Sequence, residues 1–269
     1  ELVTCSQKRV KIKDPYTGEK KEMIMMGSNN YLGLTSHPEV VKGGKKAAEK
    51  YGSGAGSVPL LAGTMDIHKK LESRLADLKG CEDAIIFTSG YSSNIGAIVA
   101  LMGKNDVVIN DRLNHASLID GCKLSGASFK TFRHNDMESL ERALKICEER
   151  YKGKLIIVDG IFSMDGDIAR LPEIKELAEK YNARIMVDEA HATGVIGEKG
   201  KGTPSYFNME GELDIVAGTL SKALGACGGF IAAREDVINY IRFYARTYMF
   251  STALPPSVTG SLIAAIKVM

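Results

Sequence analysis

The sequence lacks the features that define several classes of protein. No apolar run reaches about 18 residues before a charge or a glycine interrupts it, which excludes a transmembrane helix. Lys and Arg number 35 against 33 Asp and Glu, so the chain has neither a strongly basic nucleic-acid surface nor an acidic tail. The five cysteines are scattered, odd in number and never spaced C-x-x-C. This pattern indicates reduced thiols in a cytoplasmic chain, with no disulfide framework, zinc site or other metal site.

Two nucleotide-binding motifs are also absent. Asp188-Glu189 follows an apolar strand, but no G-x-x-x-x-G-K-[ST] loop precedes it, which argues against a Walker-type site. No G-x-G-x-x-G opens a helix, so a Rossmann dinucleotide-binding module is disfavoured as well. What is present is an ordinary globular composition, with 44% hydrophobic and 25% charged residues in a chain of 269. This length suits one large domain or one and a half.

Short apolar strands alternate with amphipathic helices along most of the chain, after a charged surface stretch that extends to about Met26. We predict strands at Ala84–Thr88, Val107–Ile109, Leu155–Val158, Arg184–Val187 and Leu213–Val216. We predict helices at Pro38–Tyr51, Asp66–Lys79, Ser92–Met102, Asp136–Glu149, Pro172–Tyr181 and Ser257–Met269. The strands lack apolar/polar alternation, which is typical of strands buried on both faces. The fold class is therefore α/β, with a mostly parallel central sheet flanked by helices.

Polar residues follow several of these strands, where ligands bind in open α/β sheets. The turn Ser89-Gly90-Tyr91 leads into a helix and offers backbone N–H groups to a phosphate, although most such turns are simple connections. Asp188 ends a strand and His191 follows it. The Asp188 carboxylate could hold a cationic ring nitrogen and the His191 imidazole could bond a nearby oxygen of a ligand. Equally, Asp188 could cap a helix and His191 could be a structural histidine.

Two further strand ends complete this set. Lys222 lies among hydroxyls and glycines in a segment otherwise poor in charge, so it is either a surface lysine or a Schiff-base amine. Thr219 and Ser221 offer hydroxyl groups to a phosphate, and His115 is either a loop histidine or a ring that stacks on a flat ligand. Together the four segments describe a ligand with a phosphate, a cationic ring nitrogen, a flat ring and an aldehyde, which is pyridoxal 5′-phosphate (PLP).

The motifs resemble those of the α-oxoamine synthases, a branch of the fold-type-I PLP enzymes. The resemblance extends from about Gly27 to Pro256. It is carried by NNYLGL (29–34), FSMDGD (162–167), DEAHATG (188–194), TLSKALG (219–225) and FST (250–252). The family includes 8-amino-7-oxononanoate synthase, glycine C-acetyltransferase, 5-aminolevulinate synthase and serine palmitoyltransferase. It implies a transferase that condenses a small amino acid (glycine, alanine or serine) with an acyl-CoA, releasing CoA and CO₂.

The resemblance also implies roles for individual residues. Lys222 would bind PLP covalently, Asp188 would pair with the ring nitrogen, His191 would bond the ring oxygen and His115 would stack on the ring. Ser89, Gly90, Tyr91, Thr219 and Ser221 would surround the phosphate, and Ser163 would line the cofactor site. Family members are homodimers with a shared active site, in which Ser251 and Thr252 would reach a neighbour's phosphate. Asn29 would lie in the loop near the substrate.

The same resemblance divides the chain into an N-terminal segment (1–35), a large PLP-binding domain (36–256) and the start of a helix (257–269). Because the sequence opens on Glu1 and ends in an apolar segment without a stop signal, we expect further residues downstream. The smaller C-terminal domain of the family, which usually supplies an arginine for the substrate carboxylate, would then be largely outside this chain.

Some positions depart from the family pattern, and alternatives remain open. Asp159 replaces a common Glu, Arg170 replaces a common Pro, and Ser57–Leu60 replaces a stretch that often contains Arg. The main alternative is another PLP enzyme, either an aminotransferase or a carbon–sulfur lyase. The motifs DEAHATG and FSMDGD argue against this alternative. A non-catalytic partner subunit is a further alternative, but such subunits lack the lysine that is present here as Lys222.

Overall fold

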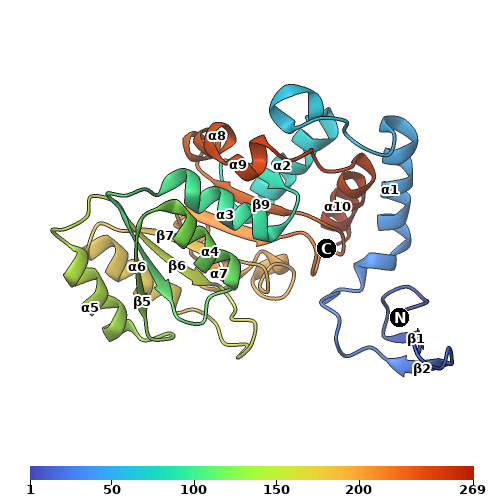
Figure 1. Ribbon diagram of the computed structural model, residues 1–269, viewed down its shortest axis with the longest axis horizontal. Coiled ribbons are helices and arrows are strands. Elements are labelled where there is room, and N and C mark those ends of the chain that lie inside the picture. Colours follow the sequence, from blue (N-terminus) through green and yellow to red (C-terminus); the bar gives the residue numbers. More distant parts are fainter.

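The computed structural model describes all residues from Glu1 to Met269 and shows an α/β fold built on one seven-stranded sheet (Figure 1). The strand order is β3-β9-β8-β7-β6-β4-β5. The strands are β3 (Asp83–Phe87), β4 (Val107–Asp111), β5 (Ser128–Phe132), β6 (Lys154–Asp159), β7 (Arg184–Asp188), β8 (Ile215–Thr219) and β9 (Gly229–Ala233). A separate antiparallel hairpin is formed by β1 (Arg9–Lys13) and β2 (Lys20–Ile24), around the turn in the charged N-terminal stretch.

The sheet is mostly parallel, as the sequence predicts. Strands β5, β4, β6, β7 and β8 pair in parallel, whereas β9 runs antiparallel to both of its neighbours, β8 and β3. Because β9 reverses between them, β3 and β8 point in the same direction. Every strand except β9 therefore ends at the same edge of the sheet, where the ligand site of an α/β fold is expected.

Helices cover both faces of the sheet, because its strands present apolar side chains on both sides. Strands β4, β6, β8 and β9 are buried at every residue. The α-helices are α1 (Pro38–Tyr51), α2 (Asp66–Lys79), α3 (Gly90–Leu101), α4 (Ala116–Ser125), α5 (Met137–Cys147), α6 (Leu171–Lys180), α7 (Thr203–Tyr206), α8 (Glu235–Tyr244), α9 (Arg246–Met249) and α10 (Pro256–Val268). Short helical turns occur at η1 (Leu34–Ser36), η2 (Pro59–Gly63) and η3 (Glu198–Gly200).

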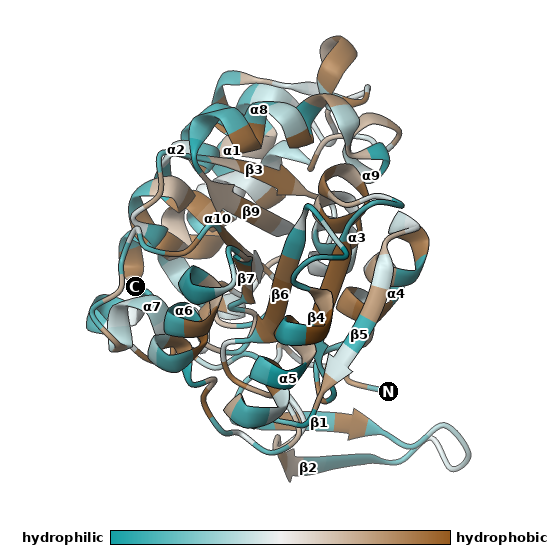
Figure 2. Cartoon of the chain, turned by 90° about the vertical axis from the view of Figure 1, so that its left-hand side faces the viewer, coloured by the Kyte–Doolittle hydropathy of each residue, from teal (hydrophilic) through white to brown (hydrophobic).

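Two apolar clusters fill the space between the sheet and these helices. On one face, α3, α4 and α8 contribute Ile98, Leu118 and Ile241. On the other face lie apolar residues of α2, α5, α6 and α10, among them Leu75 and Leu140. Figure 2 shows the central strands mostly in brown, whereas α5 and the hairpin strand β2 carry more teal. No helix combines the length and apolar character needed to cross a membrane.

The structure contains several elements that are not predicted from the sequence, among them helices α4 and α8. The strand predicted at Leu213–Val216 is β8 and begins later, at Ile215, because Leu213 and Asp214 belong to the preceding turn. Strand β5 was not predicted, since it lies at the sheet edge and is only partly buried. Strand β9 was also missed, because Gly229 and two alanines (232 and 233) give it a weak strand propensity.

The first and last long helices, α1 and α10, lie side by side although they are far apart in the sequence (Figure 1). Glycines make this contact close. A Cβ atom at Gly43 would lie 2.7 Å from the carbonyl oxygen of Gly260, and one at Gly260 would lie 2.5 Å from Cβ of Ala47. The contact packs α1 against the last helix of the chain, and Leu34, just before α1, is buried in the core of the sheet domain.

Candidate active site

The carboxyl ends of β3, β4, β6, β7 and β8 surround one cavity of about 260 Å³. Each strand is followed by a turn that places polar side chains or backbone N–H groups into this space. The lining residues are Ser89, Gly90, Tyr91, Asn94, His115, Ser117, Asp159, Ile161, Asp188, Ala190, His191, Thr219, Ser221 and Lys222. The structure therefore brings together nine of the residues selected from the sequence, although they come from four separate segments.

The N-terminus of α3 forms one end of the cavity. Ser89 caps this helix, because its Oγ accepts a hydrogen bond from the N–H of Ser92. The N–H groups of Gly90 and Tyr91 have no acceptor within the chain, and the positive end of the helix dipole lies here. Thr219 and Ser221 add hydroxyl groups, whose oxygens lie 2.7 Å apart. This end of the cavity has the donors that a phosphate needs.

Small residues allow α3 to begin this close to the sheet. A Cβ atom at Gly229 of β9 would lie 2.5 Å from the backbone nitrogen of Gly90, and one at Gly90 would lie 3.0 Å from Cβ of Thr219. The glycine at position 90 therefore brings the free N–H groups next to the Thr219 and Ser221 hydroxyls.

A buried carboxylate lies deeper in the cavity. Asp188, which ends β7, is 5% exposed. Its Oδ1 accepts the N–H of Ala190, and its Oδ2 accepts an N–H of the Asn94 side chain at 2.7 Å. The same Asn94 amide donates to Ser117 Oγ at 2.9 Å. The carboxylate is thus held in place by hydrogen bonds and has no cationic side chain bonded to it.

Lys222 and His191 form a pair beside this carboxylate. Lys222 Nζ lies 2.8 Å from His191 Nε2, and the other ring nitrogen lies 2.7 Å from the Tyr31 hydroxyl. Burial lowers the pKa of Lys222 in spite of Asp188 and Asp159. Burial and the nearby Lys222 charge lower the pKa of His191 to about 4, so the imidazole is neutral at pH 7. A lysine with a lowered pKa is a better nucleophile toward an aldehyde.

A second carboxylate lines the same cavity. Asp159 ends β6 directly beside Asp188 in the register of the two parallel strands, and it is 4% exposed. Burial and the neighbouring Asp188 charge raise the pKa of Asp159 well above its usual value. The backbone N–H of His115 points at this carboxyl group, with an N···Oδ2 distance of 3.2 Å. Burial beside the Asp188 charge therefore favours the protonated form of Asp159.

Four residues selected from the sequence do not line this cavity. Ser163 is exposed in the loop after β6, and Asn29 is exposed in the N-terminal segment, where its Oδ1 lies 3.4 Å from the Tyr31 hydroxyl. Ser251 and Thr252 line a different, much smaller cavity near α9 and β3. In a single chain Ser163, Ser251 and Thr252 are therefore separate from the cluster around Lys222, whereas Asn29 is connected to it through Tyr31. The roles of all four residues stay predictions.

Four polar residues of the site were not selected as site residues from the sequence, namely Asn94, Ser117, Tyr31 and Asp159, the last of which was noted only as a departure from the family pattern. Asn94 of α3 donates to Asp188, Ser117 of α4 accepts a hydrogen bond from the same Asn94 amide, and Tyr31 bonds to His191. Asn94 carried a detectable sign, because it is the one amide in the apolar helix segment that follows Ser93. Ser117 and Tyr31 are recognisable only once α3, α4 and the N-terminal segment are placed around β7.

Comparisons with known proteins agree with this geometry. The sequence profile of the aminotransferase class I and II family matches residues 21–269. The 8-amino-7-oxononanoate synthase of Thermoanaerobacter pseudethanolicus is 51% identical over 93% of this chain and 63% of its own length. The bipyrrole-methanol synthase PigH of a Serratia species is 45% identical over the whole chain and 41% of its own length. A serine palmitoyltransferase structure with a PLP internal aldimine superposes with a TM-score of 0.92 at 38% identity, over 99% of this chain and 66% of that one.

These matches and the site define the class of protein. The chain belongs to the aminotransferase class I and II family of fold-type-I PLP enzymes and, within it, to the α-oxoamine synthase branch. The chain spans less than two thirds of the length of the curated synthase that it matches.

Proposed function

We propose that the protein is a PLP-dependent acyltransferase. It condenses a small amino acid (glycine, alanine or serine) with an acyl-CoA to give an α-amino ketone, CoA and CO₂. The observation that carries the proposal is the single cavity in which Lys222, the buried Asp188 and the free N–H groups at the start of α3 converge. Membership of the α-oxoamine synthase branch supports the choice of reaction.

The residues of the cavity fit PLP. The N–H groups of Gly90 and Tyr91, with the Thr219 and Ser221 hydroxyls, offer donors to its phosphate. Asp188 is a buried carboxylate without a cationic partner, and it would keep the ring nitrogen protonated. When bound, PLP supplies an electron sink for the charge that develops at the α-carbon of the amino acid.

The chain's own groups hold and move protons around that carbon. The lowered pKa of Lys222 suits Nζ both for covalent attachment of PLP and for carrying the α-proton away from the substrate. Neutral His191 accepts or donates at Nε2, 2.8 Å from Lys222 Nζ, and Tyr31 fixes the ring orientation through Nδ1. His115 lies at the rim, where it would stack on the cofactor ring.

The attachment of PLP to Lys222 is tested by reduction of the full-length protein with borohydride, followed by peptide mapping. We expect the pyridoxyl label on Lys222 and no label in Lys222→Ala. Lys201, which pairs with Glu210 outside the cavity, provides the control variant Lys201→Ala, in which labelling should persist. A label on another lysine would refute the assignment.

The reaction is tested with a panel of amino acids and acyl-CoAs. We expect α-proton exchange with the amino acid alone, and release of free CoA, measured with a thiol reagent, when an acyl-CoA is added. Transamination of a keto acid without CoA release from short, medium or long acyl-CoAs would instead identify an aminotransferase.

We also propose that the working unit is a cytoplasmic homodimer with a shared active site. The support is the family resemblance and the position of Ser251 and Thr252, which lie away from the cavity of their own chain. Sedimentation of the full-length protein should give a dimer, and Ser251→Ala with Thr252→Ala should weaken PLP retention without unfolding. A fully active monomer would contradict this proposal.

A further inference from the structure

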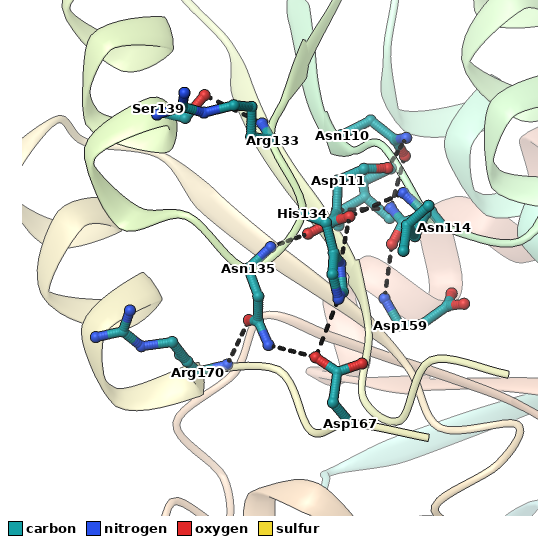
Figure 3. A network of polar contacts seen from close by, with 12 residues as sticks. Asn110, Asp111, Asn114, Arg133, His134, Asn135, Ser139, Asp159, Asp167 and Arg170 are labelled. Atoms are coloured by element: carbon teal, nitrogen blue, oxygen red, sulfur yellow. Dashed lines mark hydrogen bonds and ion pairs between the residues drawn. The ribbon is translucent and has the colours of Figure 1, made fainter. Parts of the chain in front are cut away.

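His134 lies between two carboxylates that belong to different segments of the chain (Figure 3). Its Nδ1 is 3.0 Å from Oδ1 of Asp111, the last residue of β4, and its Nε2 is 3.0 Å from Oδ2 of Asp167, in the loop after β6. His134 itself follows β5. One imidazole ring therefore joins segments that end or follow three neighbouring strands, β4, β5 and β6.

The chemistry of these two contacts requires a charged ring. An ionised carboxylate only accepts hydrogen bonds, and a neutral imidazole has only one N–H. A neutral ring would therefore direct a lone pair at one of the two carboxylates. With both nitrogens protonated, the ring donates to both, and neither nitrogen has a lone pair left for a metal ion.

The surroundings favour the charged form. The charged groups that face His134 are Asp111 from β4 and, from the loop after β6, Asp167 and Asp165, while the Phe162 ring packs edge-on at 4.4 Å. Burial lowers the pKa of His134, but the hydrogen bonds and charges of Asp111 and Asp167 outweigh it, so the pKa is raised overall. Its side chain is 21% exposed, so protons can exchange with water.

One carboxylate sets the turn that carries His115. Asp111 Oδ1 also accepts the N–H of Leu113 at 2.9 Å, which shapes the turn after β4. The next residue, Asn114, accepts the N–H of Asp159 at 2.9 Å, and the N–H of His115 points at the Asp159 carboxyl group. Two hydrogen bonds, from the Leu113 N–H to Asp111 and from the Asp159 N–H to Asn114, therefore connect Asp111 to groups that line the cavity.

The other carboxylate holds the loop that follows β6. The carbonyl of Asp167 accepts the N–H of Phe162 at 3.0 Å, and the carbonyl of Phe162 accepts the N–H of Gly166 at 2.8 Å. This closed loop contains Ser163 and directly follows Ile161, which lines the cavity. The side chain of Asn135 also bonds Asp167, at 2.8 Å, so the loop is tied to the segment after β5 at two points.

We propose that His134 is a positioning residue, whose imidazolium clamps the His115 turn to the 161–167 loop and so fixes one wall of the cofactor cavity, and that this clamp opens as the pH rises. The proposal rests on the proposed function only for the identity of the cofactor. His134 acts through Asp111 and Asp167 and touches neither cofactor nor substrate.

The direction of the pH effect follows from linkage. A histidine whose pKa is raised in the folded state stabilises it fully at pH values below the unfolded pKa, and this stabilisation is lost as the pH rises through the folded pKa. Above that value the ring donates only one hydrogen bond. One of the two segments then loses its bond to His134 and is held to the segment after β5 through Asn135.

The first experiment measures hydrogen exchange of the 162–167 amides in the full-length apoprotein between about pH 6 and 9, corrected for intrinsic exchange. In the wild type we expect protection to fall about tenfold with rising pH, because a hydrogen bond to a charged group is lost. In His134→Gln, protection should be low throughout. Asp165→Asn is the matched control, since Asp165 lies in the same loop but makes no hydrogen bond to His134. It should be protected at low pH and lose protection as the pH rises, as the wild type does, but at a slightly lower pH because one carboxylate that faces His134 is removed. If the 162–167 amides of His134→Gln were as strongly protected as those of the wild type, the proposal would be overturned.

The second experiment measures the dissociation constant of PLP by spectroscopic titration over the same pH range. The constant should be about tenfold larger in His134→Gln and nearly unaffected in Asp165→Asn. Should His134→Gln fail to fold, Asp167→Asn removes one side of the clamp, and histidine-labelled NMR of the wild type reports the charge directly. A neutral His134 ring at pH 7 in that spectrum would refute the clamp, whether or not the protein is an acyltransferase.

Discussion

Asp159 occupies a position where the fold gains no stability from its charge. It is buried beside Asp188, and the two parallel strands that they end hold them in register. Its raised pKa means that the folded state binds a proton more tightly than the unfolded state does. Stability from this group is present at acidic pH and falls as the pH rises from the ordinary carboxyl pKa through the raised one.

Asp159→Asn should therefore stabilise the apoprotein above the raised pKa and have little effect in acid. The amide keeps an acceptor for the His115 N–H and removes the charge that repels Asp188. Each kcal/mol gained raises the melting temperature by about 2–4 °C for a chain of this size. Thermal unfolding of wild type and variant between about pH 4 and 8 measures the difference, and a difference that does not change with pH would contradict the explanation.

Asp188 has the opposite character, because its charge is the property that the proposed chemistry requires. Asp188→Asn preserves the size of the side chain but removes the partner of a protonated ring nitrogen. PLP should still bind, whereas kcat should fall by about 10²–10³, as when other preorganised electrostatic contacts are removed. Steady-state kinetics at saturating PLP provide the measurement. Turnover close to that of the wild type would exclude the electron-sink role.

At the scale of elements, the position of the first turn of α3 depends on Gly229 of β9, which has no side chain. In Gly229→Ala, the new Cβ would meet the backbone of Ser89 and Gly90 at 2.5 Å, so the first turn of α3 must move away from the sheet. We expect a loss of affinity for PLP and for inorganic phosphate, measured by titration, while circular dichroism still shows a folded protein. Gly54→Ala is the control, since its Cβ would meet no atom within 4 Å. Unchanged affinity in Gly229→Ala would show that the helix start does not bind the phosphate.

A buried ion pair fixes the turn after β7. Lys79, the last residue of α2, is bonded to Glu189 Oε2 at 3.4 Å, to Thr193 Oγ1 at 2.8 Å and to the carbonyl of Lys201 at 2.6 Å. Glu189 also bonds Thr203, and both charged side chains are almost fully buried. This pair holds the segment between Asp188 and His191 from the side opposite the cavity.

Removal of one partner should be costly, because it leaves the other charge buried and unpaired. Lys79→Met or Glu189→Gln should lower the free energy of unfolding by about 3–5 kcal/mol each, measured in urea. The double variant should lose clearly less than the sum of the single losses. Additive losses would indicate that the two groups act independently.

Much of this architecture is predictable from local patterns, and the remainder depends on long-range contacts. Asp188, Lys222 and Ser89 could be identified as site residues from the sequence, because residues that line the sheet edge lie within a few positions of a strand end. Ser117 fixes the Asn94 amide that bonds Asp188 only because α3 and α4 pack together, and no local pattern specifies that contact. Strand β9, with its glycine and alanines, becomes a strand by insertion between β3 and β8.

At the scale of the whole molecule, the position of β9 constrains the order in which the chain acquires its structure. During synthesis β3 emerges early, but its one partner in the sheet is β9, which follows every other strand. Strands β5, β6, β7 and β8 each pair with a strand that has already been made, whereas β3 exposes unpaired backbone groups until the chain turns back after β8. Contacts of such long sequence separation form slowly. Because the cofactor cavity needs both Ser89, after β3, and Lys222, after β8, it takes shape only after β9 has been made, later than the parallel part of the sheet.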